Sequence, residues 1–244
     1  MCGRFAITDP LKEIMERYMA SIAEGFEYRP NYNAAPMQYI PTILAGKDGK
    51  NKLGALRWGL VPSWANDDKI GSKMINAPAE TLVEKPAFKR LISSKRCIIP
   101  TNGFYEWKKE DSGKRPMRIL MKDDRLFSLA GLYDTWTDPD GNKLSTCTII
   151  TTEPNSLMED IHNRMPVILR PKDEAEWLGR DNDDVNFLQG LLKPYEAAKM
   201  RVYEVSKEVG SVRNNDVGLL KKINLLFECR PNGTHFFYPK LWKW

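Results

Sequence analysis

The sequence predicts an α+β domain built mainly on an antiparallel β-sheet. In the middle of the chain, extended apolar segments are joined by short turns rich in Asp, Gly and Ser, as in β-hairpins. Helical periodicity, in contrast, is confined to short stretches. The chain has 244 residues without a repeat or an obvious linker, so we expect one domain with a substantial core.

An amphipathic helix is expected near the N-terminus. Asp9-Pro10 is typical of an N-cap followed by proline at the first helical position. One apolar stripe at helical spacing comes next, formed by Leu11, Ile14, Met15, Tyr18, Met19 and Ile22. We expect this stripe to face the core.

Two hairpins are expected farther along the chain. Segments 96–109 and 115–122 flank a turn at 110–113, and segments 126–138 and 144–152 flank a turn at 138–141. Further strands are expected at 165–170 and 201–206, and short helices at about 85–93, 155–161, 172–178 and 184–192. Strands therefore outnumber helices.

The composition is that of a soluble globular protein, with 42% hydrophobic and 28% charged residues. No apolar run approaches the ~20 residues of a membrane-spanning helix, and the first residues lack the apolar region of a signal peptide. We therefore expect a cytoplasmic protein with no membrane partner. The net charge of +5 is compatible with a polyanionic partner without establishing one.

Four cysteines are widely separated and form no CxxC pair, and the chain has 2 histidines, so we expect neither a structural zinc site nor a disulfide framework. Cys2 is unusual because it begins the motif MCGRF, where Gly3 permits close backbone approach and Arg4 attracts anions. A lone cysteine is more often structural than nucleophilic, and both interpretations stay open at this point.

Three polar residues interrupt apolar segments. Asn76 in INAPAET fits a helix cap or turn, and His162 in DIHNRMPVIL fits either a helix-end cap or a proton-exchanging group. Glu106 in GFYEW shares a strand face with Phe104, between aromatic neighbours. Burial there would raise its pKa and make it a proton donor near neutral pH, although a salt-bridged glutamate is the more common occupant of such a position.

The joint pattern is more informative than any single residue. Seven segments occur in order, namely MCGRF, NYNAAP, WGLVPSWA, INAPAET, RCIIPTNGFYEW, IHNRMPVIL and VSKEVGSVRNND. Together they resemble the SRAP family of SOS-response-associated peptidases, also called abasic site processing proteins, from residue 2 to about residue 216. The resemblance implies a barrel-like, largely antiparallel mixed sheet flanked by short helices. We expect residues 217–244, an aromatic and basic extension, to pack on this same domain.

The resemblance also implies a covalent chemistry for the second residue. In the family, the initiator methionine is removed, and the new N-terminal cysteine crosslinks to the aldehyde of a ring-opened abasic site in single-stranded DNA. An N-terminal cysteine offers an α-amine with a pKa near 8 beside a thiol. The amine condenses with the aldehyde to an imine, and the thiol then closes a five-membered thiazolidine. The position of Cys2 is then explained, because the amine exists only at the chain end.

Residues that match the family motifs are carried over one by one. The resemblance implies that Asn76 orients Cys2 and the opened sugar, and that Glu106 and His162 transfer protons. Arg4 and Arg164 match phosphate-binding residues, Trp64 matches a stacking aromatic, and Asn33 is expected to line the same pocket. Pro78 departs from the family, which commonly has a phosphate-binding arginine there, so we expect somewhat weaker DNA affinity.

We expect a monomeric enzyme that needs no cofactor and associates with the nucleoid after DNA damage. The family name also implies a hydrolase of the peptidase class. Lyase activity on the same lesion and autocatalytic removal of Met1 are further expectations from the resemblance. Two alternatives stay open. One is a cysteine peptidase or N-terminal-nucleophile hydrolase using Cys2, His162 and Glu106. The other is a passive single-strand-binding module, which leaves MCGRF without a purpose.

Overall fold

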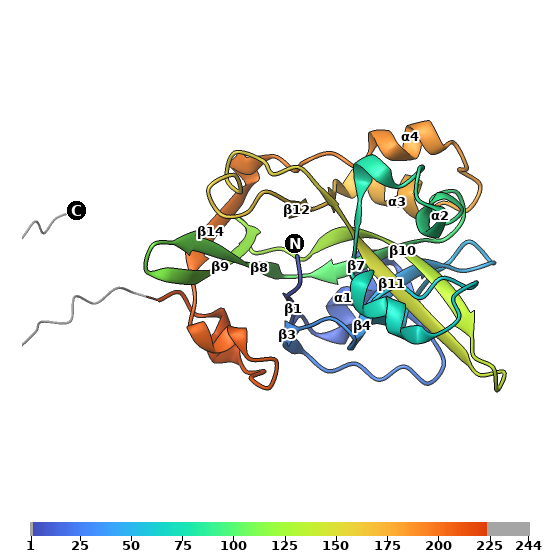
Figure 1. Cartoon of the computed structure of the whole chain (residues 1–244), viewed down its shortest axis with the longest axis horizontal. Coiled ribbons are helices and arrows are strands. Elements are labelled where there is room, and N and C mark those ends of the chain that lie inside the picture. The colour runs from blue at the N-terminus through green and yellow to red at the C-terminus, as the bar shows by residue number, and fades with distance from the viewer. Residues whose placement is uncertain (1, 224–244) are drawn as a thin grey trace, which may run out of the picture.

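The larger of two β-sheets closes on itself (Figure 1), as seen in a computed structural model that describes residues 2–223. Its ring consists of β4 (Tyr39–Ala45), β5 (Asn51–Trp58), β7 (Arg96–Thr101), β10 (Phe127–Thr137) and β11 (Lys143–Thr152). Neighbours in the order β5-β4-β7-β10-β11 are antiparallel, and β11 closes the ring by pairing in parallel with β5. The expected barrel-like mixed sheet of an α+β domain is confirmed.

Four short strands extend this barrel sheet: β2 (Ala20–Ile22), β6 (Asn76–Pro78), β12 (Met165–Pro166) and β13 (Ile168–Leu169). β6 and β12 both pair with β11, and β2 pairs with β5. The first of these pairings matters most for the site, because it places residue 76 beside a barrel strand.

The smaller sheet has the order β14-β9-β8-β1-β3. Its strands are β1 (Phe5–Ile7), β3 (Asn31–Ala34), β8 (Gly103–Glu110), β9 (Gly113–Met121) and β14 (Met200–Glu204). β8 and β9 form the expected hairpin, and β1 lies between β8 and β3 near the centre of Figure 1.

Residues 96–109, predicted as one strand, form two strands in different sheets. β7 ends in the barrel, and β8 begins in the smaller sheet after a corner at Asn102. Gly103 adopts a φ of 153°, and a Cβ there would lie 2.9 Å from the carbonyl oxygen of Ile119. The Asn102 side chain holds the corner, because its Oδ1 accepts a hydrogen bond from the Thr8 main-chain nitrogen over 2.7 Å.

The first helix is shorter than predicted. α1 (Leu11–Tyr18) ends at Met19, which has a left-handed φ of 46°, and β2 follows at once. Met19 is 86% exposed and Ile22 is also exposed, so the expected buried stripe ends at Tyr18. The N-cap position belongs to Pro10 instead of Asp9.

The other helices are short. They are α2 (Pro86–Lys89), α3 (Glu174–Leu178) and α4 (Val185–Gly190), with 3-10 turns η1 (Asp68–Lys73), η2 (Ala79–Thr81), η3 (Pro171–Asp173), η4 (Ala197–Lys199), η5 (Lys207–Gly210) and η6 (Val217–Leu220). Figure 1 shows α2, α3 and α4 at the same end of the molecule. The expected helix at 155–161 is absent from the described chain. The Asn155 side chain instead accepts hydrogen bonds from the nitrogens of Leu157 and Met158 in a turn.

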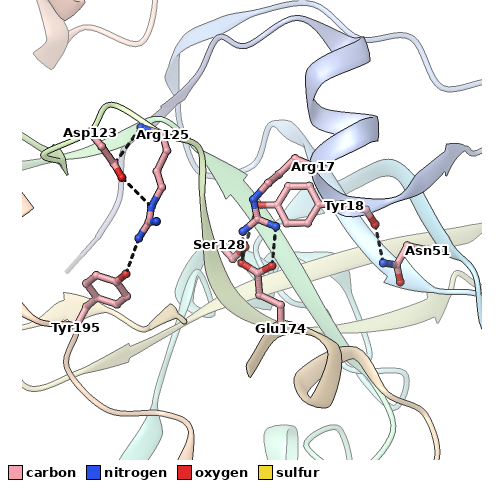
Figure 2. A network of polar contacts seen from close by, with 8 residues as sticks. All are labelled: Arg17, Tyr18, Asn51, Asp123, Arg125, Ser128, Glu174 and Tyr195. Carbon is pink, nitrogen blue, oxygen red and sulfur yellow. Dashed lines mark hydrogen bonds and ion pairs between the residues drawn. The ribbon is translucent and has the colours of Figure 1, made fainter. Parts of the chain in front are cut away.

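A buried polar network joins α1 and α3 to the barrel (Figure 2). Arg17 donates two hydrogen bonds to the Glu174 carboxylate, over 2.8 and 2.7 Å. Ser128 on β10 donates to Glu174 over 2.7 Å, and its hydroxyl lies 2.8 Å from the hydroxyl of Tyr18. The buried carboxylate is therefore fully engaged, as a buried charge requires.

The two faces of the smaller sheet cover separate apolar clusters. Phe104 packs in the main core, whereas Tyr105 packs with Ala6, Val205 and Val209 in a second, smaller cluster. No helix within residues 2–223 is long and apolar enough to cross a membrane. The expected packing of the C-terminal extension falls largely on 224–244, which lie outside the described residues.

Candidate functional site

Cys2 lies at the junction between the two sheets and is fully buried in the main core. The antiparallel register of β1 and β8 pairs Phe5 with Phe104, and continuing that register places Gly3 opposite Glu106. The main chain follows it, since the nitrogen of Tyr105 donates to the carbonyl oxygen of Arg4 over 2.9 Å. Strand pairing thus brings residue 2 next to the GFYEW segment.

Glu106 is only 3% exposed. Its strand alternates as expected, with Phe104 in the main core and Tyr105 in the second cluster. Burial raises the pKa of Glu106 to about 7, because a low-dielectric environment disfavours the charged carboxylate. The sequence-based expectation of a raised pKa is confirmed. A carboxyl group with this pKa both donates and accepts protons near neutral pH.

Asn76 reaches the same junction from the barrel. β6 pairs in parallel with β11, with Asn76 beside Ile149. The Asn76 side-chain nitrogen donates a hydrogen bond to the main-chain oxygen of Cys2 over 3.1 Å. Its Oδ1 is buried and has no hydrogen-bond partner among residues 2–223. Asn76 therefore holds the N-terminal segment and keeps a buried acceptor for a further donor.

The Cys2 thiol is protonated at neutral pH. Burial raises its pKa well above the ordinary value, and the nearby charge of Glu106 raises it further. A buried thiol of this kind reacts only when a neighbouring group accepts its proton. The charge of Glu106 acts directly on this thiol, so its carboxylate is the candidate acceptor.

His162 lies in the turn between β11 and β12, beside the end of β8. It lines a hollow of about 350 Å³ together with Trp107, Lys109 and residues 159–163. Burial lowers the pKa of His162, and the Lys109 ammonium lowers it further. The ring is therefore mainly neutral at pH 7.

The Arg164 peptide groups contact the His162 ring. Nδ1 of His162 accepts a hydrogen bond from the Arg164 main-chain nitrogen over 3.0 Å, and the Arg164 carbonyl oxygen lies 3.2 Å from the same atom. With the proton of the neutral ring on Nε2, Nδ1 accepts from the Arg164 N–H; with the proton on Nδ1, the ring donates to the Arg164 carbonyl oxygen. A protonated ring can donate from Nδ1 to the carbonyl instead, so both protonation states have a partner.

Arg4 and Asn33 hold the segment that follows β14. Nη1 of Arg4 donates to Oδ1 of Asn33 over 2.8 Å and to the carbonyl oxygen of Val209 over 2.7 Å. Nδ2 of Asn33 donates to the carbonyl oxygens of Val209, Ser211 and Asn214. The Arg4 guanidinium also lies 5.7 Å from the ring centre of Trp107, which lines the His162 hollow. Both residues therefore have partners within the protein.

Arg164 also has a protein partner, one that the sequence did not reveal. Its guanidinium binds both oxygens of Glu80, over 2.9 and 2.8 Å, and donates to the carbonyl oxygen of Thr151 over 2.7 Å. Glu80 lies four residues after Asn76 in INAPAET. Opposite charges in two of the family motifs were the available signal, but these residues are 84 positions apart and nothing in the sequence pairs them.

Trp64 is 57% exposed and lies over a different hollow. That hollow measures about 340 Å³ and is also lined by Arg90, Lys95 and Asp134. An exposed indole beside two cationic side chains suits a stacked base with neighbouring phosphates. The structure thus groups Cys2, Asn76 and Glu106, places His162 next to the end of the same strand, and places Trp64 at a hollow whose lining includes none of them.

Within residues 2–223, no three His, Cys, Asp or Glu side chains are grouped to hold a metal ion.

Residues 1–212 match the family model described as SOS response associated peptidase (SRAP). The chain belongs to this family. Abasic site processing protein YoqW of Bacillus subtilis is 55% identical over 225 residues, covering 91% of this chain and 99% of that protein. Abasic site processing protein HMCES of Xenopus tropicalis is 33% identical over 220 residues, and the match covers 78% of this chain and 65% of that protein. This SRAP chain is thus similar to proteins named for abasic sites in both a bacterium and a vertebrate.

The fold of this SRAP chain matches that of solved structures. A crystal structure of a protein from Bacteroides thetaiotaomicron superimposes with a TM-score of 0.82 at 29% identity, covering 91% of this chain and all of the other. A second, from Bordetella bronchiseptica, superimposes with a TM-score of 0.72 at 21% identity.

Proposed function

We propose that this chain captures abasic sites in single-stranded DNA through a covalent bond to Cys2. The observation that carries the proposal is the position of Cys2, buried between the Asn76 amide and the Glu106 carboxyl group. Membership in the SRAP family and similarity to proteins named for abasic site processing support it.

The proposed reaction begins with maturation. In the full chain the nitrogen of Cys2 belongs to a peptide bond and is not nucleophilic, so Met1 must be removed first. The freed α-amine then adds to the aldehyde carbon of the ring-opened sugar, and loss of water gives an imine. The Cys2 sulfur adds to the imine carbon, its proton passes to the nitrogen, and a thiazolidine results. One water is released, and neither oxidant nor metal is needed.

Glu106 and His162 supply the proton transfers in this scheme. Glu106, with a pKa of about 7, donates a proton to the departing hydroxyl and accepts one from the thiol. His162, whose ring is held by the peptide groups of Arg164, is assigned to reversal of the adduct or to strand cleavage. Asn76 positions Cys2 through its carbonyl oxygen and offers Oδ1 to the sugar.

Contacts with DNA are assigned from exposure and charge. Trp64 stacks on a base, which is the usual way of holding single-stranded DNA. Arg4 and Arg164 are assigned to phosphates on the family motif, although each guanidinium already binds acceptors of the protein. Asn33 is buried and supports Arg4, so its contribution to the pocket is through that side chain.

A peptidase mechanism fits the thiol less well. Cysteine peptidases depend on a thiol whose pKa is lowered by a neighbouring imidazolium, so that the thiolate is present at neutral pH. The pKa of the Cys2 thiol is raised instead, by burial and by Glu106. We therefore assign any peptidase chemistry to removal of Met1 alone.

The test is denaturing gel electrophoresis of the mature protein with single-stranded DNA carrying one abasic site. Intact mass spectrometry of the same sample establishes whether Met1 is gone. We expect a heat-stable shifted band that is lost with undamaged DNA and with Cys2→Ala. Absence of that band from protein with a free Cys2 amine would overturn the proposal and leave the peptidase and passive-binding alternatives to be tested.

A further inference from the structure

We propose that Glu80 is a positioning residue, which fixes the turn carrying His162 against the strand carrying Asn76 by holding the guanidinium of Arg164. This inference rests on the proposed function for its kinetic consequence. Its structural part, the orientation of the His162 ring, can be measured without any reaction.

The contact between Glu80 and Arg164 is geometrically demanding. Nη1 and Nη2 of Arg164 bind separate oxygens of the carboxylate, over 2.9 and 2.8 Å. Such a two-bond fork fixes both the distance and the plane of the guanidinium, which a single charged contact does not. The Arg164 side chain is 23% exposed, so one end of this fork is substantially sheltered from solvent.

Three chain segments meet at this fork. Nη2 of Arg164 also donates to the carbonyl oxygen of Thr151 on β11 over 2.7 Å. Thr151 pairs in parallel with Pro78, at the end of the strand that bears Asn76, and antiparallel with Pro166, just after the His162 turn. One guanidinium therefore ties the catalytic segments to each other and to a barrel strand.

Arg164 transmits this position to the imidazole ring of His162 through its main chain. The Arg164 side chain binds Glu80, and the main-chain N–H of Arg164 donates to Nδ1 of His162 over 3.0 Å. If the Arg164 backbone shifts, the contacts at Nδ1 that orient the ring, and with it Nε2, are lost. Proton transfer requires this nitrogen to be held in reach of the reacting group, so misplacement slows the reaction.

A simpler interpretation is that the Glu80 carboxylate merely binds the Arg164 guanidinium at the place where a DNA phosphate would bind. A carboxylate and a phosphate bind the guanidinium fork in the same way, so the two would compete. Under that interpretation, neutralising Glu80 strengthens DNA binding and leaves the crosslinking rate unchanged. The positioning role predicts the opposite pattern, which makes Glu80→Gln decisive.

The kinetic experiment compares mature wild-type protein with Glu80→Gln under single-turnover conditions. The probe is a single-stranded oligonucleotide with one abasic site, and affinity is measured separately on an undamaged oligonucleotide of the same sequence. We expect the first-order crosslinking rate of Glu80→Gln to fall about tenfold to a hundredfold, with the Kd changed by less than about twofold. Glu84→Gln removes the same charge from an exposed residue of the same segment, and should match wild type.

The structural experiment uses two-bond ¹H–¹⁵N correlation spectra at pH 8, without DNA. The chain has 2 histidines, so a His235→Gln background leaves ring signals from His162 alone. We expect the neutral ring to be protonated on Nε2 in wild type and in Glu84→Gln, and to show mixed tautomers in Glu80→Gln. Arg164→Lys, which keeps the charge but loses the fork, should reproduce the mixture and the slower rate, and thermal melts establish that both variants are folded.

Two outcomes would overturn the positioning role. One is a wild-type ring tautomer in Glu80→Gln, and the other is tighter DNA binding at an unchanged crosslinking rate. If wild-type protein forms no adduct at all, the proposed function fails, whereas the NMR comparison still decides whether Glu80 positions His162.

Discussion

The side-chain amide of Asn76 donates a hydrogen bond to the main-chain oxygen of Cys2 across 3.1 Å, joining residues 74 positions apart in the sequence. This contact connects the start of the smaller sheet to β6, which extends the barrel sheet. The acceptor belongs to Cys2 itself, so the bond restrains the residue that must meet the aldehyde. Its loss should affect the reaction more than the fold.

The first prediction concerns Asn76→Asp. A carboxylate cannot donate to the Cys2 carbonyl and places negative charge against it, so both the hydrogen bond and its geometry are lost. We expect the single-turnover crosslinking rate to fall about tenfold to a hundredfold, in line with a loss of about 1–3 kcal/mol for a buried polar contact.

The control for this variant is Asn186→Asp, the same substitution at an exposed position at the start of α4. Rates are measured on denaturing gels, with thermal melts to verify folding. A wild-type rate in folded Asn76→Asp would show that the Cys2 carbonyl contact is irrelevant to the reaction.

The second prediction concerns the pH dependence of stability and Glu106. The folded protein holds the Glu106 proton up to a pKa of about 7, whereas the unfolded chain releases it near 4.5. The unfolded state is therefore increasingly favoured as pH rises from about 4.5 to 7. Below this range the carboxyl group is protonated in both states and does not change the free energy of unfolding. At about 1.4 kcal/mol per pKa unit, the penalty at pH 8 is of order 3 kcal/mol.

Glu106→Gln removes this penalty, because the amide is neutral at every pH. We expect the variant to be more stable than wild type at pH 8 and equally stable at pH 4, as measured by urea denaturation. Glu159→Gln, at an exposed glutamate that lines the His162 hollow, should show no such pH-dependent difference. Equal stability of wild type and Glu106→Gln at pH 8 would contradict a raised pKa.

The third prediction is that the same substitution abolishes most of the reaction. Glutamine has neither the acid nor the base form that the proposed proton transfers need. The more stable Glu106→Gln variant should therefore crosslink more slowly. We expect at least about a hundredfold loss of crosslinking rate at pH 7, since general acid–base catalysis contributes about 10²–10⁴-fold. Retention of the wild-type rate would remove Glu106 from the mechanism.

The sequence predicted the parts of the site that depend on local alternation. Glu106 follows Phe104 by two residues, and the period of a strand therefore places both on one face, where the structure buries them. The role of Cys2 came from the family motifs and remains a prediction. Its burial was not foreseen, because it depends on pairing between β1 and β8, which are about 100 residues apart.

The parts that the sequence missed depend on long-range contacts. The helical stripe continued to Ile22 because this last residue of β2 happens to fit helical spacing, and only the pairing of β2 with β5 shows that it lies in a strand. β4 and β5 were not predicted, although they complete the barrel, because their pairing with β7 and β11 leaves no local signal. The corner at Asn102 and the ion pair of Glu80 with Arg164 also require the assembled fold.

The fourth prediction separates stability from activity at Glu174. Glu174→Gln weakens the paired hydrogen bonds with Arg17 and removes the charge that balances it (Figure 2). We expect a loss of about 1–3 kcal/mol in the free energy of unfolding, because the arginine is left half-buried without its anion. The crosslinking rate should stay at the wild-type level, since this network joins α1 and α3 to β10 and includes none of Cys2, Asn76 and Glu106. Glu176→Gln, an exposed neighbour on α3, is the control, and equal urea midpoints for the two variants would contradict the prediction.

The fifth prediction concerns Trp64, whose exposed indole lies over a hollow beside Arg90 and Lys95. Because the ring is 57% exposed, its removal should leave the melting temperature nearly unchanged. Stacking of a base on an aromatic side chain contributes about 1–3 kcal/mol, so Trp64→Ala should weaken binding of single-stranded DNA about fivefold to 150-fold. Fluorescence anisotropy with an undamaged oligonucleotide measures this loss independently of the covalent step.

Tyr39→Ala removes another aromatic residue that is 62% exposed, and should bind as wild type does. If Trp64→Ala binds DNA as well as Tyr39→Ala does, the hollow at Trp64 is not on the path of the DNA. If Trp64→Ala alone binds weakly yet crosslinks at the wild-type rate under saturating DNA, Trp64 contributes to capture and not to chemistry.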